Sequence, residues 1–179
     1  MTNEILVAEC LRADPEQKPG AALLGLIAAL ERKGGGTGPV TEGEIRDVLE
    51  SVSLGLEDVC GYVRADPEKY SRCRVIRTDR YEVLVFCWLG GQRSSVHDHT
   101  GSACGVRVVS GTATEVGFVR TPGSELAVAD RVSRLDEGDV TASFDSDIHR
   151  IQNDGVDELV TLHVYSPPLE FMRTYAARE

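Results

Sequence analysis

The sequence has few basic residues, no compact cysteine motif and no long apolar run. Its 19 Lys and Arg stand against 29 Asp and Glu, which gives a formal net charge of −10. Because nucleic acids and anionic membranes are bound through basic patches, we expect neither as a partner. No apolar run approaches the length of about 20 residues that a transmembrane helix needs, and the start, MTNEILVAEC, lacks the basic segment of a signal peptide. We therefore expect a cytoplasmic protein that acts as a monomer.

The cysteines argue against a disulfide scaffold. There are five, an odd number, and no two form a C-x-x-C pair. A reducing compartment fits this usage better than a secreted one. With 179 residues the chain is long enough to bury a good core, and we expect one domain spanning 1–179. The cysteines are Cys10, Cys60, Cys73, Cys87 and Cys104.

The first part of the chain has helical patterning. Between residues 4 and 32 apolar residues recur at helical spacing, and Pro15 and Pro19 divide them into two predicted helices. Residues 33–39, KGGGTGP, form a loop by composition.

A capping box predicts a third helix. Thr41 and Glu44 match the pattern S/T-x-x-E, and the helix that they open should continue to about Ser51. We expect a helical portion over 1–55, packed on the outside of the β-structure that follows.

The pattern changes to a period of two from about residue 70. Alternation of apolar and polar residues is typical of β-strands, and turn pairs such as Ser110-Gly111 and Glu137-Gly138 separate the runs. Many short strands at regular intervals indicate a sandwich or a barrel. We expect a mainly β protein with a β-barrel core over 70–170. The predicted strands are residues 73–76, 82–88, 105–109, 113–119, 126–132, 140–144 and 159–165.

The most informative stretch is GQRSSVHDHTGSACGVRVVSG, residues 91–111. It places His97 and His99 two residues apart, and in a strand residues i and i+2 point to the same face. Two imidazoles on one face can bind a divalent metal. Asp98 lies between them, so we expect it to face away and to support the loop.

A second histidine motif follows later in the chain. His149 and Asn153 form an H-x3-N pattern, with Gly138 upstream as a turn glycine. Together with the first motif, it predicts a metal site made by His97, His99 and His149. Imidazole suits Zn, Fe, Cu and Ni alike, so the residues alone leave the metal open. Three neutral ligands keep the ion's full double charge, which favours an anionic ligand such as a thiolate.

Both motifs resemble those of the cupin barrels, whose first motif reads G-x5-H-x-H-x(3–4)-E-x6-G. Gly91, His97, His99 and Gly111 fit every spacing, but the usual Glu ligand is replaced by Cys104. The Pro-x-Gly usually found in the second motif is missing. The resemblance implies a double-stranded β-helix, or jelly-roll, barrel with the N-terminal helices packed outside.

From about residue 70 to residue 168 the chain resembles one cupin family in particular, the cysteine dioxygenases. The likeness is carried by SSVHDHTGSAC (94–104), HRIQN (149–153) and LHVYSPP (162–168). Members of that family bind Fe(II) with three histidines. The resemblance therefore implies Fe(II) as the cofactor, and a small thiol and O2 as the substrates.

The resemblance also implies a pocket for the substrate carboxylate. The family's arginine for this group matches Arg72, and Tyr70 would line the same pocket. A guanidinium suits a carboxylate because its donor fork makes a bidentate, charge-assisted pair. Arg74 and Arg77 are competitors if the register differs. Met172 departs from members that have Cys at its position, and it could reshape the pocket.

A third resemblance concerns the family's Ser/Thr-x-His-x-Tyr set, matched by Thr161, His163 and Tyr165. Alternation puts the three side chains on one face, where they could form a relay inside the barrel. In animal-type members, a Cys at the position of Cys104 forms a thioether with the tyrosine that matches Tyr165. The Ser166–Pro167 bond resembles one that is cis in the family.

We therefore expect an Fe(II)-dependent thiol dioxygenase that oxidises L-cysteine to cysteine sulfinate, an essentially irreversible step. Two alternatives stay open. The substrate could be another small thiol, such as 3-mercaptopropionate, although that branch typically has Gln at the position of Arg72. The protein could instead be a metal-binding cupin without oxygenase activity, holding zinc or no metal, which would take up no O2 with any thiol.

Overall fold

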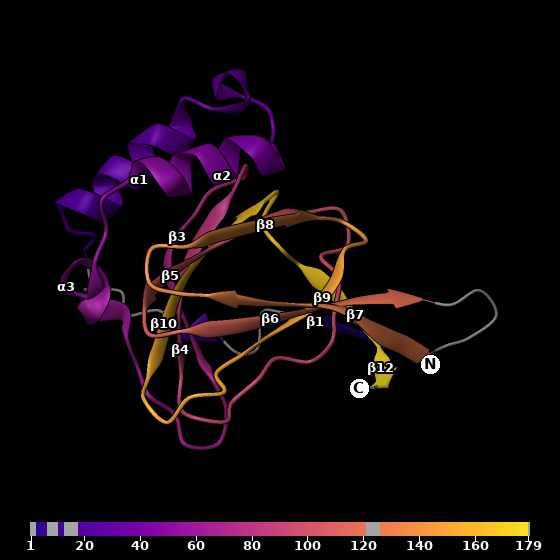
Figure 1. The fold of residues 1–179 in the computed structure, drawn as a ribbon. Helices are drawn as coiled ribbons and strands as arrows, with labels where there is room; N and C mark the ends of the chain where they lie inside the picture. Colours follow the sequence, from indigo (N-terminus) through magenta and orange to yellow (C-terminus); the bar gives the residue numbers. More distant parts are fainter. Residues whose placement is uncertain (1–2, 7–10, 13–17, 121–125, 179) are drawn as a thin grey trace.

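β-Strands are the main element of the protein (Figure 1). The computed structural model describes residues 3–6, 11–12, 18–120 and 126–178, and describes side chains from residue 18 onward. The helices are α1 (Ala21–Glu31), α2 (Glu42–Ser51) and α3 (Leu56–Val59), with short 3-10 turns η2 (Gly34–Gly36) and η3 (Cys60–Tyr62). The strands are β1 (Asn3–Leu6), β2 (Leu11–Arg12), β3 (Ser71–Arg77), β4 (Glu82–Trp88), β5 (Ala103–Ser110), β6 (Ala113–Arg120), β7 (Leu126–Leu135), β8 (Val140–Phe144), β9 (Ile148–Gln152), β10 (Leu159–Ser166), β11 (Phe171–Thr174) and β12 (Ala176–Arg178).

The strand pattern expected from the sequence is confirmed between β3 and β8 and again at β10. Each of the seven predicted strands overlaps an observed one. Alternation does not predict β9, because its apolar residues, Ile148 and Ile151, are three positions apart rather than two. The predicted turn at Pro122-Gly123 lies outside the described residues.

Two of the three predicted helices are confirmed as α1 and α2. Thr41 Oγ1 accepts from the Glu44 N–H at 3.4 Å, and Glu44 Oε2 accepts from the Thr41 N–H at 3.0 Å, so the predicted capping box is present. Among the described residues, no helix combines the length and the apolarity needed to cross a membrane.

The helix predicted before Pro15 is wrong over the residues that the structure describes. Residues 3–6 form β1, which pairs antiparallel with β11, and residues 11–12 form β2, which pairs in parallel with β3. An unpaired strand edge supplies hydrogen-bond partners that the local pattern does not reveal, so tertiary pairing overrides a weak helical preference. The remaining residues of that predicted helix, Cys10 among them, lie outside the described part of the chain.

The strands form two large sheets and one small one. The six-stranded sheet has the order β2-β3-β4-β10-β5-β8, and the four-stranded sheet has the order β12-β7-β6-β9. The small sheet β1-β11 is connected to β9 through His97, which makes isolated bridges to both His149 and Thr174. Figure 1 shows α1 and α2 together on one side of the barrel, and α2 contacts β5 and β8.

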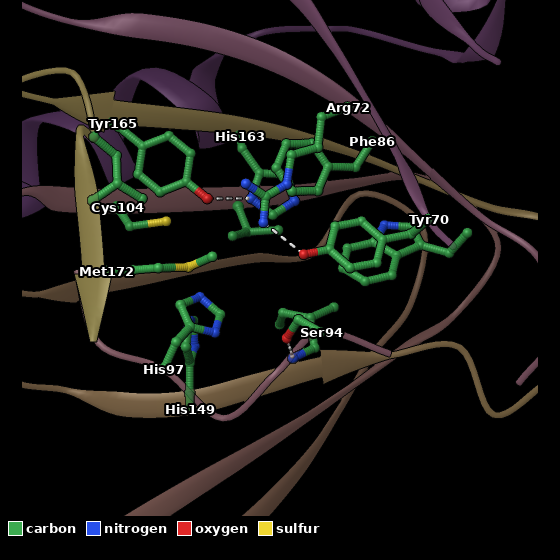
Figure 2. Close-up of a pocket in the computed structure, with 14 residues that line it drawn as sticks. Tyr70, Arg72, Phe86, Ser94, His97, Cys104, His149, His163, Tyr165 and Met172 are labelled. Carbon is green, nitrogen blue, oxygen red and sulfur yellow. Dashed lines mark hydrogen bonds between the residues drawn. The ribbon is translucent and has the colours of Figure 1, made fainter. Parts of the chain in front are cut away.

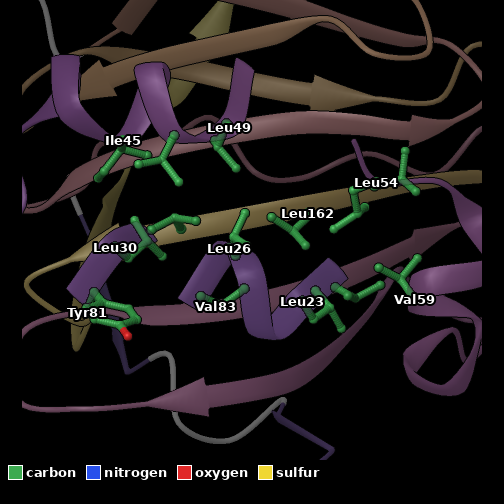
Figure 3. Packing of buried hydrophobic residues seen from close by; sticks show 14 of the residues in the cluster. Leu23, Leu26, Leu30, Ile45, Leu49, Leu54, Val59, Tyr81, Val83 and Leu162 are labelled. Carbon is green, nitrogen blue, oxygen red and sulfur yellow. The ribbon is translucent and has the colours of Figure 1, made fainter. Parts of the chain in front are cut away.

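The six-stranded sheet buries both of its faces, so its central strands carry two kinds of side chain. On the outer face, Val83 and Leu162 pack under the helix residues Leu26 and Ile45 (Figure 3). On the inner face, the aromatic side chains of β4 and the polar side chains of β10 point into the barrel. Successive residues of a strand face opposite sides. The helices therefore cover one face, and the other is left to line a site.

Three tight turns use the glycines singled out from the motifs. Gly91, Gly111 and Gly138 have φ values of 81°, 87° and 92°. Positive φ is adopted readily by glycine, which has no Cβ to clash with the backbone. At Gly111 a Cβ would also lie 2.9 Å from the carbonyl oxygen of Glu158. These turns return the chain between strands that border the histidine motifs.

Candidate active site

The three motif histidines meet inside the barrel. One potential ligand atom from each of His97, His99 and His149 lies within 4.8 Å of the other two. The Nε2 atoms of His99 and His149 are 3.2 Å apart. His149 is in β9, whereas His97 and His99 lie in the extended segment that follows β4. The main chain of His97 pairs with that of His149 through two hydrogen bonds of 2.9 and 3.0 Å, and this pairing fixes the two imidazoles relative to each other.

Each of the three imidazoles has a partner for its Nδ1 atom. Nδ1 of His97 is 2.9 Å from the carbonyl oxygen of Ser95, Nδ1 of His99 is 3.3 Å from the hydroxyl of Ser143, and Nδ1 of His149 is 2.8 Å from the carboxylate of Glu115. A histidine that donates from one nitrogen keeps the lone pair of the other for a metal. The Nε2 atoms are thereby left for a metal, and because one ligand atom from each ring lies within 4.8 Å of the others, the residues fit a divalent ion.

Burial keeps two of these imidazoles, those of His97 and His99, uncharged. It lowers the pKa of His97 to about 3, with a further contribution from His149. Burial also lowers the pKa of His99 well below its ordinary value. Metal ligation requires the neutral ring, so at neutral pH both histidines are already in the form that binds metal.

Asp98 points away from the metal site, as the alternation predicts. Its carboxylate accepts from the Tyr175 hydroxyl at 2.6 Å, the Thr100 hydroxyl at 2.9 Å and the Arg173 N–H at 3.2 Å. Asp98 is 1% exposed. The loop that carries two histidines is thus tied to the end of the chain by a fully buried carboxylate.

A small pocket opens in front of the histidines (Figure 2). Its free volume is about 10 Å³, close to the space that one water requires. A ligand larger than water would therefore have to displace some of the lining side chains. The lining residues are Tyr70, Arg72, Phe86, Trp88, Ser94, His97, Cys104, Val106, His149, Ile151, His163, Tyr165, Leu169 and Met172.

Of the three arginines on β3, Arg72 is the one that reaches this pocket. Its guanidinium donates to the Tyr70 hydroxyl at 2.6 Å and lies 5.2 Å from the centre of the Phe86 ring. Arg74 and Arg77 pair instead with Glu82, at 3.6 and 3.3 Å. Among the described residues that line the pocket, Arg72 is the only permanent cation, so the pocket can receive an anion at this end.

The polar residues of β10 form a hydrogen-bonded series. Thr161 Oγ1 is 2.8 Å from Nε2 of His163, and Nδ1 of His163 is 3.4 Å from the Tyr165 hydroxyl. Trp88 donates its indole N–H to Thr161 Oγ1 at 2.9 Å. Burial lowers the pKa of His163 well below its ordinary value and raises that of Tyr165 well above it. Both side chains are therefore neutral at physiological pH.

Cys104 lies directly across from Tyr165 on neighbouring strands. Both side chains are buried and line the same pocket. Burial raises the pKa of the Cys104 thiol, so the thiol is protonated at neutral pH. Figure 2 shows the Cys104 sulfur beside the Tyr165 ring and close to Met172. Seven of the nine predicted site residues thus line this pocket, and the other two, His99 and Thr161, lie next to His149 and His163.

Sequence reasoning missed two polar contributors to the site, Glu115 and Trp88. Burial is the largest influence on the pKa of Glu115 and raises it, but the combined effect of His149, Thr141 and Arg131 is greater, so the pKa is lowered overall. A usable signal was present in β6, because alternation puts Glu115 on the same face as Ala113 and Gly117. A carboxylate between two small residues on a buried face needs a partner there.

Comparison with known proteins places the chain in a family. The family model described as Cysteine dioxygenase type I matches residues 40–178. The chain is 30% identical over 141 residues to the protein named Cysteine dioxygenase type 1 from Danio rerio, covering 75% of this chain and 70% of that one. The protein of that name from Homo sapiens is 25% identical over 139 residues, with the same coverage.

Solved structures agree on the fold. A protein from Klebsiella pneumoniae, described as having a double-stranded β-helix domain, has a TM-score of 0.52 at 24% identity, over 65% of this chain and 93% of that chain. A protein from Thermus thermophilus has a TM-score of 0.53 at 22% identity, over 62% and 95%. With the β-barrel, the three-histidine cluster and the matched family model all present, the chain belongs to the cysteine dioxygenase type I family of the cupin fold.

Proposed function

We propose that the protein is an Fe(II)-dependent dioxygenase that converts L-cysteine and O2 into cysteine sulfinate. The observation that carries the proposal is the placement of Arg72 in the same pocket as the three-histidine cluster. An amino acid with a thiol carries both groups that such a pocket would hold: a sulfur for the metal and a carboxylate for the guanidinium. The cysteine usage supports a reducing, cytoplasmic setting for this enzyme.

His97, His99 and His149 would hold the metal. When bound, Fe(II) supplies positions for the thiolate and O2 and the redox chemistry that lets O2 react with sulfur. The balance needs no further reductant, because both oxygen atoms of O2 end on the sulfur of the sulfinate.

The remaining pocket residues would orient the substrate. Arg72 pairs with the carboxylate as a rigid bidentate donor, and Tyr70 holds the guanidinium through the 2.6 Å hydrogen bond. Tyr165 stays protonated, so its hydroxyl can donate a hydrogen bond to the substrate carboxylate or to oxygen. Thr161 and His163 hold that hydroxyl in place, and Cys104 is positioned for a thioether bond with Tyr165.

Arg72 also bears on the rival substrate. A thiol such as 3-mercaptopropionate has the carboxylate but no amine, and the branch that uses it typically has Gln at this position. Both thiols offer a carboxylate to Arg72, so it is the resemblance at this position, Arg rather than Gln, that favours cysteine. The other rival, a metal-binding cupin without oxygenase activity, gives the hydrogen-bonded series on β10 no role.

The test is O2 consumption by the Fe(II)-loaded protein with L-cysteine and with 3-mercaptopropionate. We expect uptake with cysteine and formation of cysteine sulfinate. Arg72→Gln should lower kcat/KM for cysteine by about 10- to 100-fold, the range expected from losing a hydrogen bond to a charged group. Arg74→Gln is the matched control, because Arg74 lies on the same strand and pairs with Glu82.

Three outcomes separate the alternatives. A preference for 3-mercaptopropionate would keep the oxygenase and overturn the substrate. Uptake with neither thiol would leave only the metal-binding cupin. Equal losses in the two arginine variants would remove Arg72 from its assigned role.

A further inference from the structure

The partners of the three histidine Nδ1 atoms differ in charge. His97 meets a backbone carbonyl and His99 meets a serine hydroxyl, whereas His149 meets the carboxylate of Glu115 at 2.8 Å. In the described part of the chain, Glu115 is thus the one charged group among these three partners. The three imidazoles therefore differ in the charge of the group behind each ring, and only His149 has an anionic partner.

Glu115 is built into the barrel, not placed by chance. It is 3% exposed, and its second oxygen accepts from the Thr141 hydroxyl at 3.1 Å. Arg131 comes within 3.9 Å of the same oxygen, but its side chain is 64% exposed, so water screens most of its effect. The carboxylate is held chiefly by Thr141 and His149.

The strand register explains how Glu115 reaches its partner. On β6 and β9, Gly117 pairs with His149, and Glu115 pairs with Ile151. Glu115 and His149 are thus diagonal neighbours on one face, within reach of a long side chain. Because Gly117 has no side chain, it leaves the diagonal open.

Glu115 approaches the histidines from the side away from the substrate pocket. A second cavity, of about 240 Å³, is lined by Glu115, Arg131 and Asp147, and His149 lines both this cavity and the substrate pocket. Glu115 does not line the substrate pocket. Glu115 therefore acts on the reaction indirectly, through its contact with His149 and through its charge.

We propose that Glu115 is a positioning residue that orients His149 and supplies the metal centre with a compensating negative charge. The proposal rests on the proposed function for the charges involved. Among the metal, Arg72 and the substrate, a divalent ion and Arg72 together carry +3, and a bound thiolate and carboxylate, with the amine neutral, carry −2. Glu115 removes the remaining +1, so the substrate complex is neutral in a buried site where net charge is costly.

Removing this charge has two opposite consequences. The metal binds more weakly, because a carboxylate raises the basicity of the histidine that it orients and holds the ring in place. Small anions bind the loaded metal more tightly, because the site then carries one more positive charge. A residue with a purely structural role would weaken both or change neither.

The experiment uses Co(II) and azide as probes, without thiol or O2. Co(II) affinity of the metal-free protein is measured by competition with a chelator, and azide affinity is measured by absorption of the Co(II)-loaded protein. For Glu115→Gln we expect a Co(II) affinity lower by about 10- to 100-fold and an azide affinity higher by about 10-fold. Thr141→Val keeps the charge, so it should weaken Co(II) binding only slightly and leave azide binding unchanged.

Glu115→Asp guards against misfolding of the Gln variant. It keeps the charge but moves it back by one methylene, so Co(II) affinity should fall while azide affinity stays as in the unaltered protein. Unchanged Co(II) binding in Glu115→Gln, or weaker azide binding, would overturn the inference. The variants could differ in Co(II) and azide affinity as expected while the unaltered protein takes up no O2 with any thiol. In that case the proposed function fails and the role of Glu115 stands.

Discussion

The hydroxyl of Tyr165 is oriented by hydrogen bonds that begin at the indole of Trp88. An indole N–H can only donate, so Thr161 Oγ1 accepts it and is free to donate its own hydrogen to His163 Nε2. The proton of neutral His163 is then on Nδ1, facing the oxygen of Tyr165. With the other tautomer, the Thr161 hydroxyl hydrogen would be buried without an acceptor, at a cost of about 1–3 kcal/mol. The series therefore leaves the hydroxyl hydrogen of Tyr165 free to point into the pocket.

This order of donors predicts coupled effects at two residues. Trp88→Phe and Thr161→Val should each lower kcat by about 10-fold with little change in KM, because each breaks one link of the series. In the double variant the loss should be no greater than in either single one. Steady-state kinetics of the four proteins checks this. Additive losses would mean that Trp88 acts on the site by another route.

Met172 is the residue at which the pocket can be resized. It is unbranched and apolar, it lines a pocket with room for about 10 Å³, and it is 5% exposed. Methionine adapts its shape more readily than other apolar side chains, so we expect it to move when the substrate enters. Met172→Ala should raise kcat/KM for thiols longer than cysteine relative to that for cysteine. Met172→Leu conserves volume and is the control; a shift in selectivity as large as in the alanine variant would contradict the prediction.

At the scale of elements, the alternating strands were readable from the sequence because apolar residues recur in them with a period of two. The H-x-H and H-x3-N motifs were readable because their residue types and spacing are typical of a metal site, although His97 and His99 lie outside the named strands. The strands β1 and β2 were not, because their pairing partners, β11 and β3, are far away in the sequence. Glu115 was missed for a related reason: its partner His149 is 34 residues away and meets it only through the pairing of β6 with β9.

The contact between α2 and β5 is close enough to test by adding one methyl group. A Cβ at Gly105 would overlap Ile45 and Leu49 of the helix. Gly105→Ala should therefore lower the free energy of unfolding by about 1–3 kcal/mol, the usual range for overpacking. Gly25→Ala is the control: it lies within α1 with nothing near its Cβ, so it should stabilise by about 1 kcal/mol. Urea denaturation of both variants checks this, and an unchanged midpoint for Gly105→Ala would refute the close contact.

At the scale of the whole molecule, the buried histidines predict acid sensitivity of the metal-free protein. The pKa of His97 is about 3 in the folded protein and 6.5 when unperturbed. The folded chain thus binds fewer protons than the unfolded chain, so stability is present above pH 6.5 and is lost as pH falls toward 3. Between pH 7 and pH 5, His97 alone should remove about 2 kcal/mol from the free energy of unfolding. The lowered pKa values of His99 and His163 act in the same direction.

Urea denaturation of the metal-free protein at pH 7 and pH 5 measures this loss. His163→Gln removes one of the titrating groups, so its stability should depend less steeply on pH. Equal stability of the unaltered protein at the two pH values would show that these histidines are protonated in the folded state.

The bridge from β9 through His97 to β11, and from there to β1, has a consequence for how the protein is made. β1 comes early in the chain and β11 comes more than 160 residues later. At a ribosome's pace of about 5–20 residues per second, β1 waits on the order of ten seconds or more for its partner. Until then, His97 also lacks Thr174, one of its two β-bridge partners. The three-histidine cluster is therefore completed late in synthesis, once both flanking strands have emerged, and an incomplete chain does not present the finished cluster.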